Sequence, residues 1–171
     1  RLHPGRYVAG SQPVGGLMRV VLVCLGNICR SPTAEAVFRQ QLSAAGLDAQ
    51  VAVDSAGTSD WHVGKPADTR TRLAAQRRGY DMTALRGRQV QVEDFSRFDL
   101  ILAMDASNLA ELQALQPANS HAQLDLYLRR YQLALDEMPD PYYGGEEAFE
   151  HVLDLAEQAA ACLLAEVRGR L

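Results

Sequence analysis

Short apolar runs alternate along the chain with longer segments in which apolar residues recur every three or four positions. The runs predict buried strands at residues 19–23, 51–55, 100–103 and 124–126. The periodic segments predict helices at residues 31–46, 70–78 and 108–115, and a long helix along the apolar stripe from Phe149 to Val167. Because strands and helices alternate, we expect an α/β fold with one central four-stranded parallel sheet and helices on both faces.

The chain of 171 residues is long enough for a single domain whose core needs no disulfide or metal for support. Its first 17 residues are rich in Gly and Pro and lack an apolar run. We therefore expect residues 1–17 to be a disordered arm or a remnant of expression, with Met18 as the natural start. The folded domain is predicted to span residues 18–171.

Composition and charge narrow the classes of function. The net charge of -4 opposes binding to nucleic acid, whose phosphates are held mainly by clustered Lys and Arg. No stretch approaches the apolar length that a membrane span requires, so we expect no association with a membrane. The 3 cysteines are an odd number in a chain without a credible secretory leader, which favours a cytoplasmic location over a secreted disulfide framework.

The segment after the first predicted strand carries the candidate chemistry. It reads Cys24-Leu25-Gly26-Asn27-Ile28-Cys29-Arg30-Ser31 and leads into a predicted helix. In parallel sheets ligands bind beyond the carboxyl ends of the strands, where loops enter helix N-termini. Such a loop can curl so that its backbone N–H groups converge on a tetrahedral oxyanion, with help from the helix N-terminus. We expect the whole loop to bind an anion.

Each residue type in this loop suits a separate task. Converging amides and the guanidinium of Arg30 favour the thiolate form of Cys24, which is the nucleophilic form of a thiol. Arg30 has a planar fork that can bind two phosphate oxygens at once. Gly26 and Asn27 suit left-handed backbone where the loop reverses. Ser31 can donate to the sulfur, and before a proline it is predicted to be the N-cap of the helix.

The loop resembles the signature Cys-x5-Arg-Ser/Thr of the low-molecular-weight protein tyrosine phosphatases. The resemblance extends from about Met18 to the C-terminus through three further segments: Val53–Thr58 followed by Trp61, Met104–Asn108, and Asp140–Tyr143. It implies an enzyme that hydrolyses phosphotyrosine in protein substrates, and small aryl phosphates, through a cysteinyl-phosphate intermediate. We expect no cofactor, and no metal because no histidine falls in a metal-ligand pattern.

The resemblance assigns the general acid to Asp140. The prolines on either side stiffen its loop, and a carboxyl beside a dianionic substrate can carry a proton near neutral pH. Trp61, Tyr142 and Tyr143 can supply flat walls for an aromatic phosphate. By resemblance these three aromatic residues line the mouth of the pocket.

The resemblance also implies a supporting network and redox control. Asn27, Ser31 and Ser55 match positions that hydrogen-bond together, but Leu85 stands where many relatives have a histidine, so we expect the support to differ. Cys29 lies five residues after Cys24, and similarity to redox-protected members favours a reversible disulfide between these two residues.

Three alternative functions are compatible with such a loop. Arsenate reductases share the fold but relay oxidation through two further cysteines, a pair that this chain lacks. A phosphoarginine phosphatase resembling this chain has threonine at the position of Ile28. A catalytically silent phosphotyrosine-binding module is disfavoured because Cys24, Arg30 and Asp140 are all intact.

Overall fold

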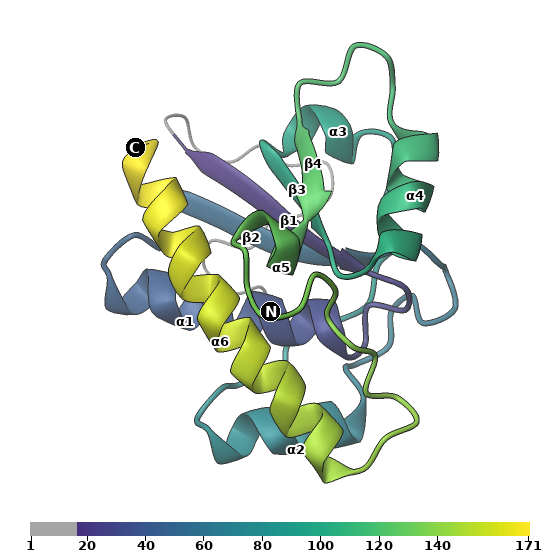
Figure 1. The fold of residues 1–171 in the computed structure, drawn as a ribbon, viewed down its shortest axis with the longest axis vertical. Coiled ribbons are helices and arrows are strands. Elements are labelled where there is room, and N and C mark those ends of the chain that lie inside the picture. The colour runs from purple at the N-terminus through teal and green to yellow at the C-terminus, as the bar shows by residue number, and fades with distance from the viewer. Residues whose placement is uncertain (1–16) are drawn as a thin grey trace.

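The computed structural model describes residues 17–171 (Figure 1), so the predicted arm at residues 1–17 lies outside the described residues apart from its last position. One sheet contains four parallel strands in the order β2-β1-β3-β4. The strands are β1 (Met18–Cys24), β2 (Val51–Gly57), β3 (Leu100–Ala103) and β4 (Gln123–Leu126). The predicted all-parallel, four-stranded sheet is confirmed, with each strand end within two residues of its expected position.

Six helices connect or follow these strands in the described part of the chain. They are α1 (Arg30–Ala44), α2 (Thr69–Arg77), α3 (Asp94–Arg97), α4 (Ala106–Leu115), α5 (Tyr127–Arg130) and α6 (Glu146–Gly169). The four longer helices were predicted, whereas α3 and α5, with four residues each, were not. A single helical turn is too short to show a hydrophobic period.

Buried side chains form two clusters, one on each face of the sheet. Val20 and Leu22 of β1 point to the cluster that also contains residues of α1 and α6. Val21 and Val23 point to the opposite cluster, where residues of α3 and α4 cover the sheet. Neighbouring strand residues face opposite sides, so a continuous apolar strand is buried on both. Helices on both faces were predicted and are present.

The sheet order places the end of β1 at a point where the chain changes direction across the sheet. After β1 the chain passes through α1 to β2 on one side, and later it crosses to β3 on the other side of β1 (Figure 1). At such a switch point the two flanking connections diverge and leave a crevice at the carboxyl ends of the strands. The segment from Cys24 to Arg30 lies there.

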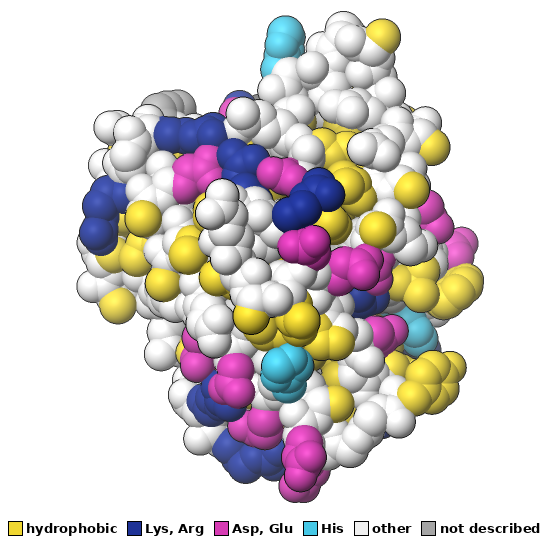
Figure 2. Space-filling view, in the orientation of Figure 1, with side chains coloured by type: hydrophobic (Ala, Val, Ile, Leu, Met, Phe, Trp, Pro, Cys, Tyr) yellow, Lys and Arg dark blue, Asp and Glu magenta, His cyan; other side chains and the backbone are white. Residues whose placement is uncertain are grey.

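The surface over α6 carries both signs of charge in close alternation (Figure 2). Glu166 of α6 accepts a hydrogen bond from Arg130 of α5 at 2.7 Å, and this contact links the two helices. Glu166 also pairs with Arg170. Mixed charge of this kind differs from the one-sign basic surface of a nucleic-acid-binding protein. Among residues 17–171, no helix combines the length and the apolar character that crossing a membrane demands.

Candidate active site

The loop between β1 and α1 is held from outside through its carbonyl groups. Three of them accept hydrogen bonds of 2.9–3.0 Å from backbone amides beyond the loop: Cys24 from Thr58, Leu25 from Ser59, and Ile28 from Asp68. Within residues 17–171, the amides of Leu25, Gly26, Ile28 and Cys29 donate to no protein acceptor. The carbonyls face the scaffold and the amides face the cavity, which is the arrangement that binds an anion.

Two residues give the loop its shape in different ways. Asn27 has a φ of 57°, so its predicted left-handed conformation is present. The same prediction for Gly26 is wrong, because Gly26 is not among the positive-φ residues of residues 17–171. Its lack of a side chain instead leaves room for His62: a Cβ on Gly26 would lie 3.0 Å from His62 Cδ2.

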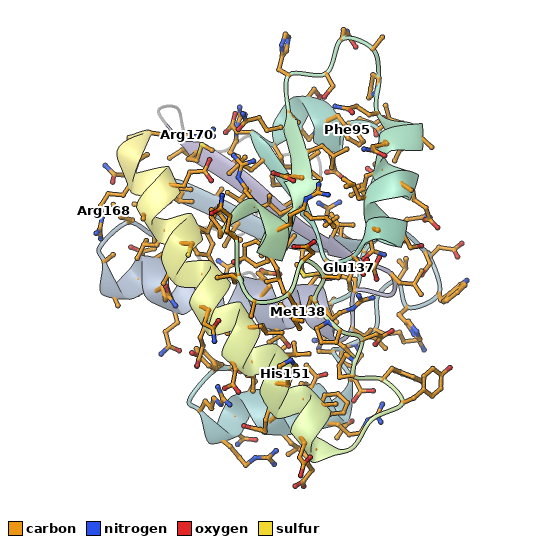
Figure 3. All side chains as sticks on the ribbon, viewed as in Figure 1. Phe95, Glu137, Met138, His151, Arg168 and Arg170 are labelled. Atoms are coloured by element: carbon orange, nitrogen blue, oxygen red, sulfur yellow. The ribbon has the colours of Figure 1, made fainter. Side chains whose placement is uncertain are left out.

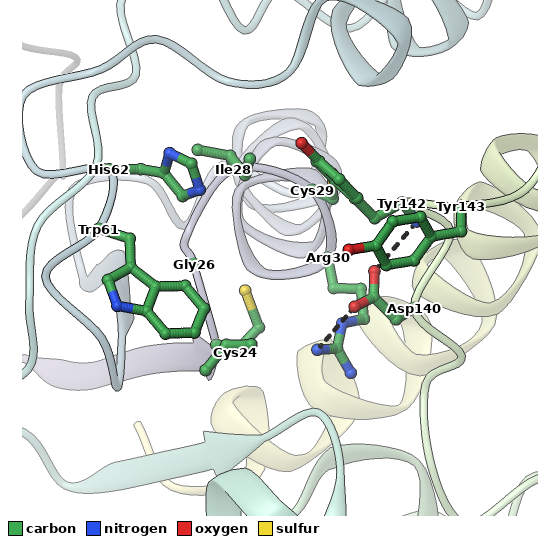
Figure 4. Close-up of a pocket in the computed structure, with 11 residues that line it drawn as sticks. Cys24, Gly26, Ile28, Cys29, Arg30, Trp61, His62, Asp140, Tyr142 and Tyr143 are labelled. Carbon is green, nitrogen blue, oxygen red and sulfur yellow. Dashed lines mark hydrogen bonds and ion pairs between the residues drawn. The ribbon is translucent and has the colours of Figure 1, made fainter.

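The inner side of the loop is the floor of a cavity of about 230 Å³ (Figure 4). The cavity is lined by Cys24, Leu25, Gly26, Ile28, Cys29, Arg30, Trp61, His62, Asp140, Tyr142 and Tyr143. Trp61 is 68% exposed and Tyr143 is 95% exposed, so these rings stand at the mouth and are not packed in the core. His62 was not predicted; its only signal in the sequence is its place beside Trp61.

The sulfur of Cys24 receives two polar contacts at the bottom of the cavity. It lies 3.0 Å from Ser31 Oγ, and the backbone N–H of Asn27 donates to it at 3.3 Å. Helix α1 already begins at Arg30, and no side chain caps it. The prediction of Ser31 as the N-cap is therefore wrong, because its hydroxyl is engaged with the sulfur and with Asn27.

The expected hydrogen bonding among Asn27, Ser31 and Ser55 is present. Asn27 Nδ2 donates to Ser31 Oγ at 2.9 Å and to Ser55 Oγ at 3.0 Å. Leu85 is buried in the larger apolar cluster, and its side chain has no group that could hydrogen-bond to this network. The side-chain oxygen of Asn27, Oδ1, accepts a hydrogen bond from the backbone N–H of Arg88 at 3.0 Å.

The guanidinium of Arg30 is buried beside the sulfur, with a side chain only 5% exposed. Its Nη1 donates to Asp105 Oδ2 at 2.6 Å and to the carbonyl of Met138 at 3.1 Å. Burial lowers the pKa of Arg30, but Cys24 and Asp105 outweigh it and the net pKa is raised. Arg30 is therefore a permanent cation. Asp105 was noted only as part of a similar segment, and its contact with Arg30 was not predicted.

The segment between α5 and α6 attaches to the site through two consecutive residues, Glu137 and Met138 (Figure 3). Glu137 accepts the backbone N–H of Ala106, the first residue of α4, at 2.6 Å. Met138 supplies the carbonyl that binds Arg30. Together these contacts fix the start of the stretch that carries Asp140.

Asp140 lies at the mouth of the cavity with half of its side chain exposed. Its Oδ2 is 3.9 Å from Arg30 Nη2, and its Oδ1 accepts the backbone N–H of Tyr142 at 3.1 Å. Arg70 of α2 donates to the carbonyl of Tyr142 at 2.8 Å and holds the same turn from the other side. A carboxyl thus lies in the cavity that Cys24 and Arg30 also line.

No group of three or more His, Cys, Asp or Glu side chains suited to a metal ion occurs within residues 17–171. The cavity combines a thiol, a permanent cation, inward backbone amides and a carboxyl. This set of groups can bind a tetrahedral oxyanion, attack it with sulfur and exchange a proton at the mouth.

Comparison with known proteins points to one family. The family model described as low molecular weight phosphotyrosine protein phosphatase matches residues 19–170. A low-molecular-weight protein-tyrosine-phosphatase of Streptomyces coelicolor is 47% identical over 157 residues, which cover 90% of this chain and 95% of the relative. The crystal structure of YfkJ from Bacillus subtilis is similar with a TM-score of 0.85 at 36% identity, over 92% of this chain and 98% of that chain. A protein tyrosine phosphatase structure from Entamoeba histolytica has a TM-score of 0.84 at 39% identity, and the match covers 90% of this chain and 99% of that chain.

The close approach of β2 to the loop gives a testable prediction. A Cβ on Gly57 would lie 2.7 Å from the carbonyl oxygen of Leu25 and 3.2 Å from the nitrogen of Asn27, both backbone atoms. Gly57→Ala should therefore displace the loop and weaken binding of inorganic phosphate by about tenfold, or about 1.4 kcal/mol, measured by calorimetry. Gly169→Ala is the control, because a Cβ there meets nothing within 4 Å. Equal affinity in the two variants would contradict the role given to Gly57.

Proposed function

This chain belongs to the low-molecular-weight phosphotyrosine protein phosphatase family, and on that premise we propose which of its residues perform the hydrolysis. The protein is a protein tyrosine phosphatase, a phosphoric monoester hydrolase. The observation that carries the residue assignment is that Cys24, Arg30 and Asp140 line one cavity. We further propose that the catalytic domain comprises residues 18–171, in keeping with the family match to residues 19–170.

In the proposed complex, the phosphate lies in the loop from Cys24 to Arg30. The inward amides donate to its oxygens, and the N-terminus of α1 adds a favourable partial charge. Asp105 and the Met138 carbonyl engage Nη1 of Arg30, which leaves its Nε and Nη2 edge to bind two phosphate oxygens side by side. These oxygens become equatorial in the transition state, and the same donors follow them.

In the first chemical step, the Cys24 thiolate attacks phosphorus in line with the bond to the leaving oxygen. The S–P bond forms as the P–O bond breaks, and Asp140 donates its proton to the departing aryl oxide. In the second step the ionised Asp140 takes a proton from a water molecule that attacks phosphorus. The S–P bond breaks, inorganic phosphate leaves, and both the thiolate and the protonated carboxyl are restored.

The walls of the cavity support an aromatic substrate. Trp61 faces Tyr142 and Tyr143 across the opening (Figure 4), and flat rings can stack on a phenyl group between them. Ile28 adds an apolar surface, which suits a phenyl ring better than a charged guanidinium. We therefore propose phosphotyrosine in proteins as the substrate, and not phosphoarginine. We also propose a cytoplasmic location, where the nucleophilic thiol stays reduced.

A substrate panel under one set of conditions tests the assignment. Phosphotyrosine peptide and p-nitrophenyl phosphate should turn over, whereas phosphoserine and phosphoarginine peptides should react at least about 100-fold more slowly. Cys24→Ser should abolish turnover while phosphate still binds, because a serine hydroxyl is a far weaker nucleophile than a thiolate. Arsenate-dependent oxidation of thiols would instead favour the reductase alternative. Phosphate binding without any turnover would favour the silent module.

The role of Asp140 predicts a dependence on the leaving group. In Asp140→Ala the departing oxygen receives no proton from the enzyme, so good leaving groups are affected least. General acids typically contribute about 10²–10⁴-fold, so phenyl phosphate should slow within that range and p-nitrophenyl phosphate should slow less. Single-turnover kinetics with a series of substituted phenyl phosphates give the slope of the logarithm of the rate against the pKa of the leaving phenol. A slope equal to that of the unsubstituted enzyme would move the acid to another residue.

We also propose redox control through Cys24 and Cys29, because both side chains line the same cavity and both are free thiols. Peroxide converts the Cys24 thiolate to sulfenic acid, and the Cys29 thiolate then displaces hydroxide from that sulfur to form the disulfide. Burial raises the pKa of Cys29 to about 12, so only a small fraction is thiolate at neutral pH. Formation of the disulfide is then limited by ionisation of Cys29.

This limit predicts how oxidation depends on pH. Below a pKa of about 12 the thiolate fraction of Cys29 rises tenfold per pH unit, so the disulfide should form about tenfold faster at pH 8 than at pH 7. Intact mass separates the outcomes, because the disulfide loses two hydrogens and over-oxidation adds oxygens. Cys29→Ser should gain oxygens and fail to recover with dithiothreitol. If the unsubstituted protein over-oxidises equally fast at both pH values, Cys29 only packs in the loop.

A further inference from the structure

Glu35 is a fully buried carboxylate to which the proposed mechanism gives no task. It lies on α1, one turn after Ser31, and its exposed fraction is 0%. Its Oε2 accepts from Arg39 Nη2 at 2.6 Å, and its Oε1 accepts the hydroxyl proton of Ser55 at 2.7 Å. Burying a carboxylate is costly unless it is paired and hydrogen-bonded. The contact with Ser55 leads toward the phosphate-binding loop.

The contact with Glu35 decides where the Ser55 proton goes, because a carboxylate can only accept hydrogen bonds. The Ser55 oxygen then accepts from Asn27 Nδ2, which is 3.0 Å away. On the other side of the amide, the backbone N–H of Arg88 donates to Asn27 Oδ1 at 3.0 Å. These two contacts fix the same orientation of the amide, with its nitrogen toward the serines.

The second proton of Asn27 Nδ2 goes to Ser31 Oγ at 2.9 Å. The Ser31 hydroxyl proton is left with two acceptors, the sulfur of Cys24 at 3.0 Å and the carbonyl of Ala56 at 3.4 Å. The sulfur is the nearer acceptor, and as a thiolate it is charged, which strengthens the hydrogen bond. A relay of hydrogen bonds with every proton assigned thus joins the buried carboxylate to the nucleophile.

We propose that Glu35, paired with Arg39, is a positioning residue that directs this relay so that Ser31 donates to the thiolate of Cys24. The inference rests on the proposed role of Cys24 as nucleophile. A donated proton stabilises the thiolate relative to the thiol, so Cys24 stays reactive at lower pH. The other charged or titratable side chains that line the cavity with Cys24 are Cys29, Arg30, His62, Asp140, Tyr142 and Tyr143.

The test is Glu35→Gln, which keeps the size of the side chain and removes its charge. Arg39, whose Nη2 also donates to the carbonyl of Val53 at 3.0 Å, can only donate hydrogen bonds, so the new amide turns its oxygen to Arg39 and its NH₂ to Ser55. The Ser55 oxygen then receives protons from two sides, and its own proton has no acceptor. The relay loses its direction, and Ser31 no longer donates steadily to the sulfur.

The readout is the rate at which iodoacetamide alkylates Cys24 as a function of pH. Only the fraction of this rate that inorganic phosphate suppresses is counted. Unfolded molecules do not contribute to that part. In Glu35→Gln the midpoint of the profile should rise by about one pH unit, which lowers the alkylation rate below the midpoint about tenfold. In a Ser31→Ala background, which lacks the last donor of the relay, Glu35→Gln should cause no further shift.

Glu166→Gln is the matched control, because Glu166 also pairs with an arginine, Arg130 at 2.7 Å, but on α5 and α6. Glu166→Gln should lower the Tm of the protein without moving the midpoint of the alkylation profile. If Glu35→Gln does not fold, Arg39→Met tests the same relay, because a buried carboxyl that loses this cation binds a proton more readily and can donate it to Ser55. An unchanged midpoint, or an equal shift in the Ser31→Ala background, would refute the relay. Absence of aryl phosphate turnover in the unsubstituted enzyme would instead refute the proposed function.

Discussion

A peptide unit can turn its N–H toward an anion only where its carbonyl finds a partner on the opposite side, and this constraint shapes the region around Cys24. The required partners come from outside the loop, from the segment that follows β2 and from the start of α2. The parallel pairing of Cys24 with Gly57 brings the first of these segments alongside. The side chain that Gly57 lacks would occupy the space of the Leu25 carbonyl. The sheet register and one glycine therefore determine where the loop amides point.

Arg30 connects the loop to the rest of the site. Its guanidinium belongs to α1, its carboxylate partner Asp105 precedes α4, and its carbonyl partner Met138 lies between α5 and α6. Three segments that are far apart in the sequence thus meet at one side chain. Because Asp140 follows Met138 by two residues, the contact that orients the Arg30 guanidinium also limits how far the carboxyl of Asp140 can lie from it.

The sequence predicts those features that depend on local pattern. Strands and long helices follow from the hydrophobic period, and the position of Cys24 in the cavity follows from its place in a loop between a strand and a helix. For Ser31 the predicted contact with the sulfur is present and the predicted N-cap role is wrong, because a serine before a helix suits both and the pattern does not choose between them. Glu35 and His62 were not predicted for a different reason. Each contacts a residue at least 20 positions away in the sequence, and a local pattern carries no information about such a contact.

Asp105 illustrates how stability and catalysis can share one side chain. One of its oxygens accepts the backbone N–H of Asn108 at 2.8 Å and caps α4, and the other binds Arg30 at 2.6 Å. Asp105→Ala would cost the cap, typically about 1 kcal/mol, and would also leave Arg30 Nη1 with the carbonyl of Met138 but without its carboxylate partner. A search for more thermostable variants that scores unfolding alone would therefore select against Asp105→Ala, and so keep the carboxylate beside Arg30, without ever measuring activity.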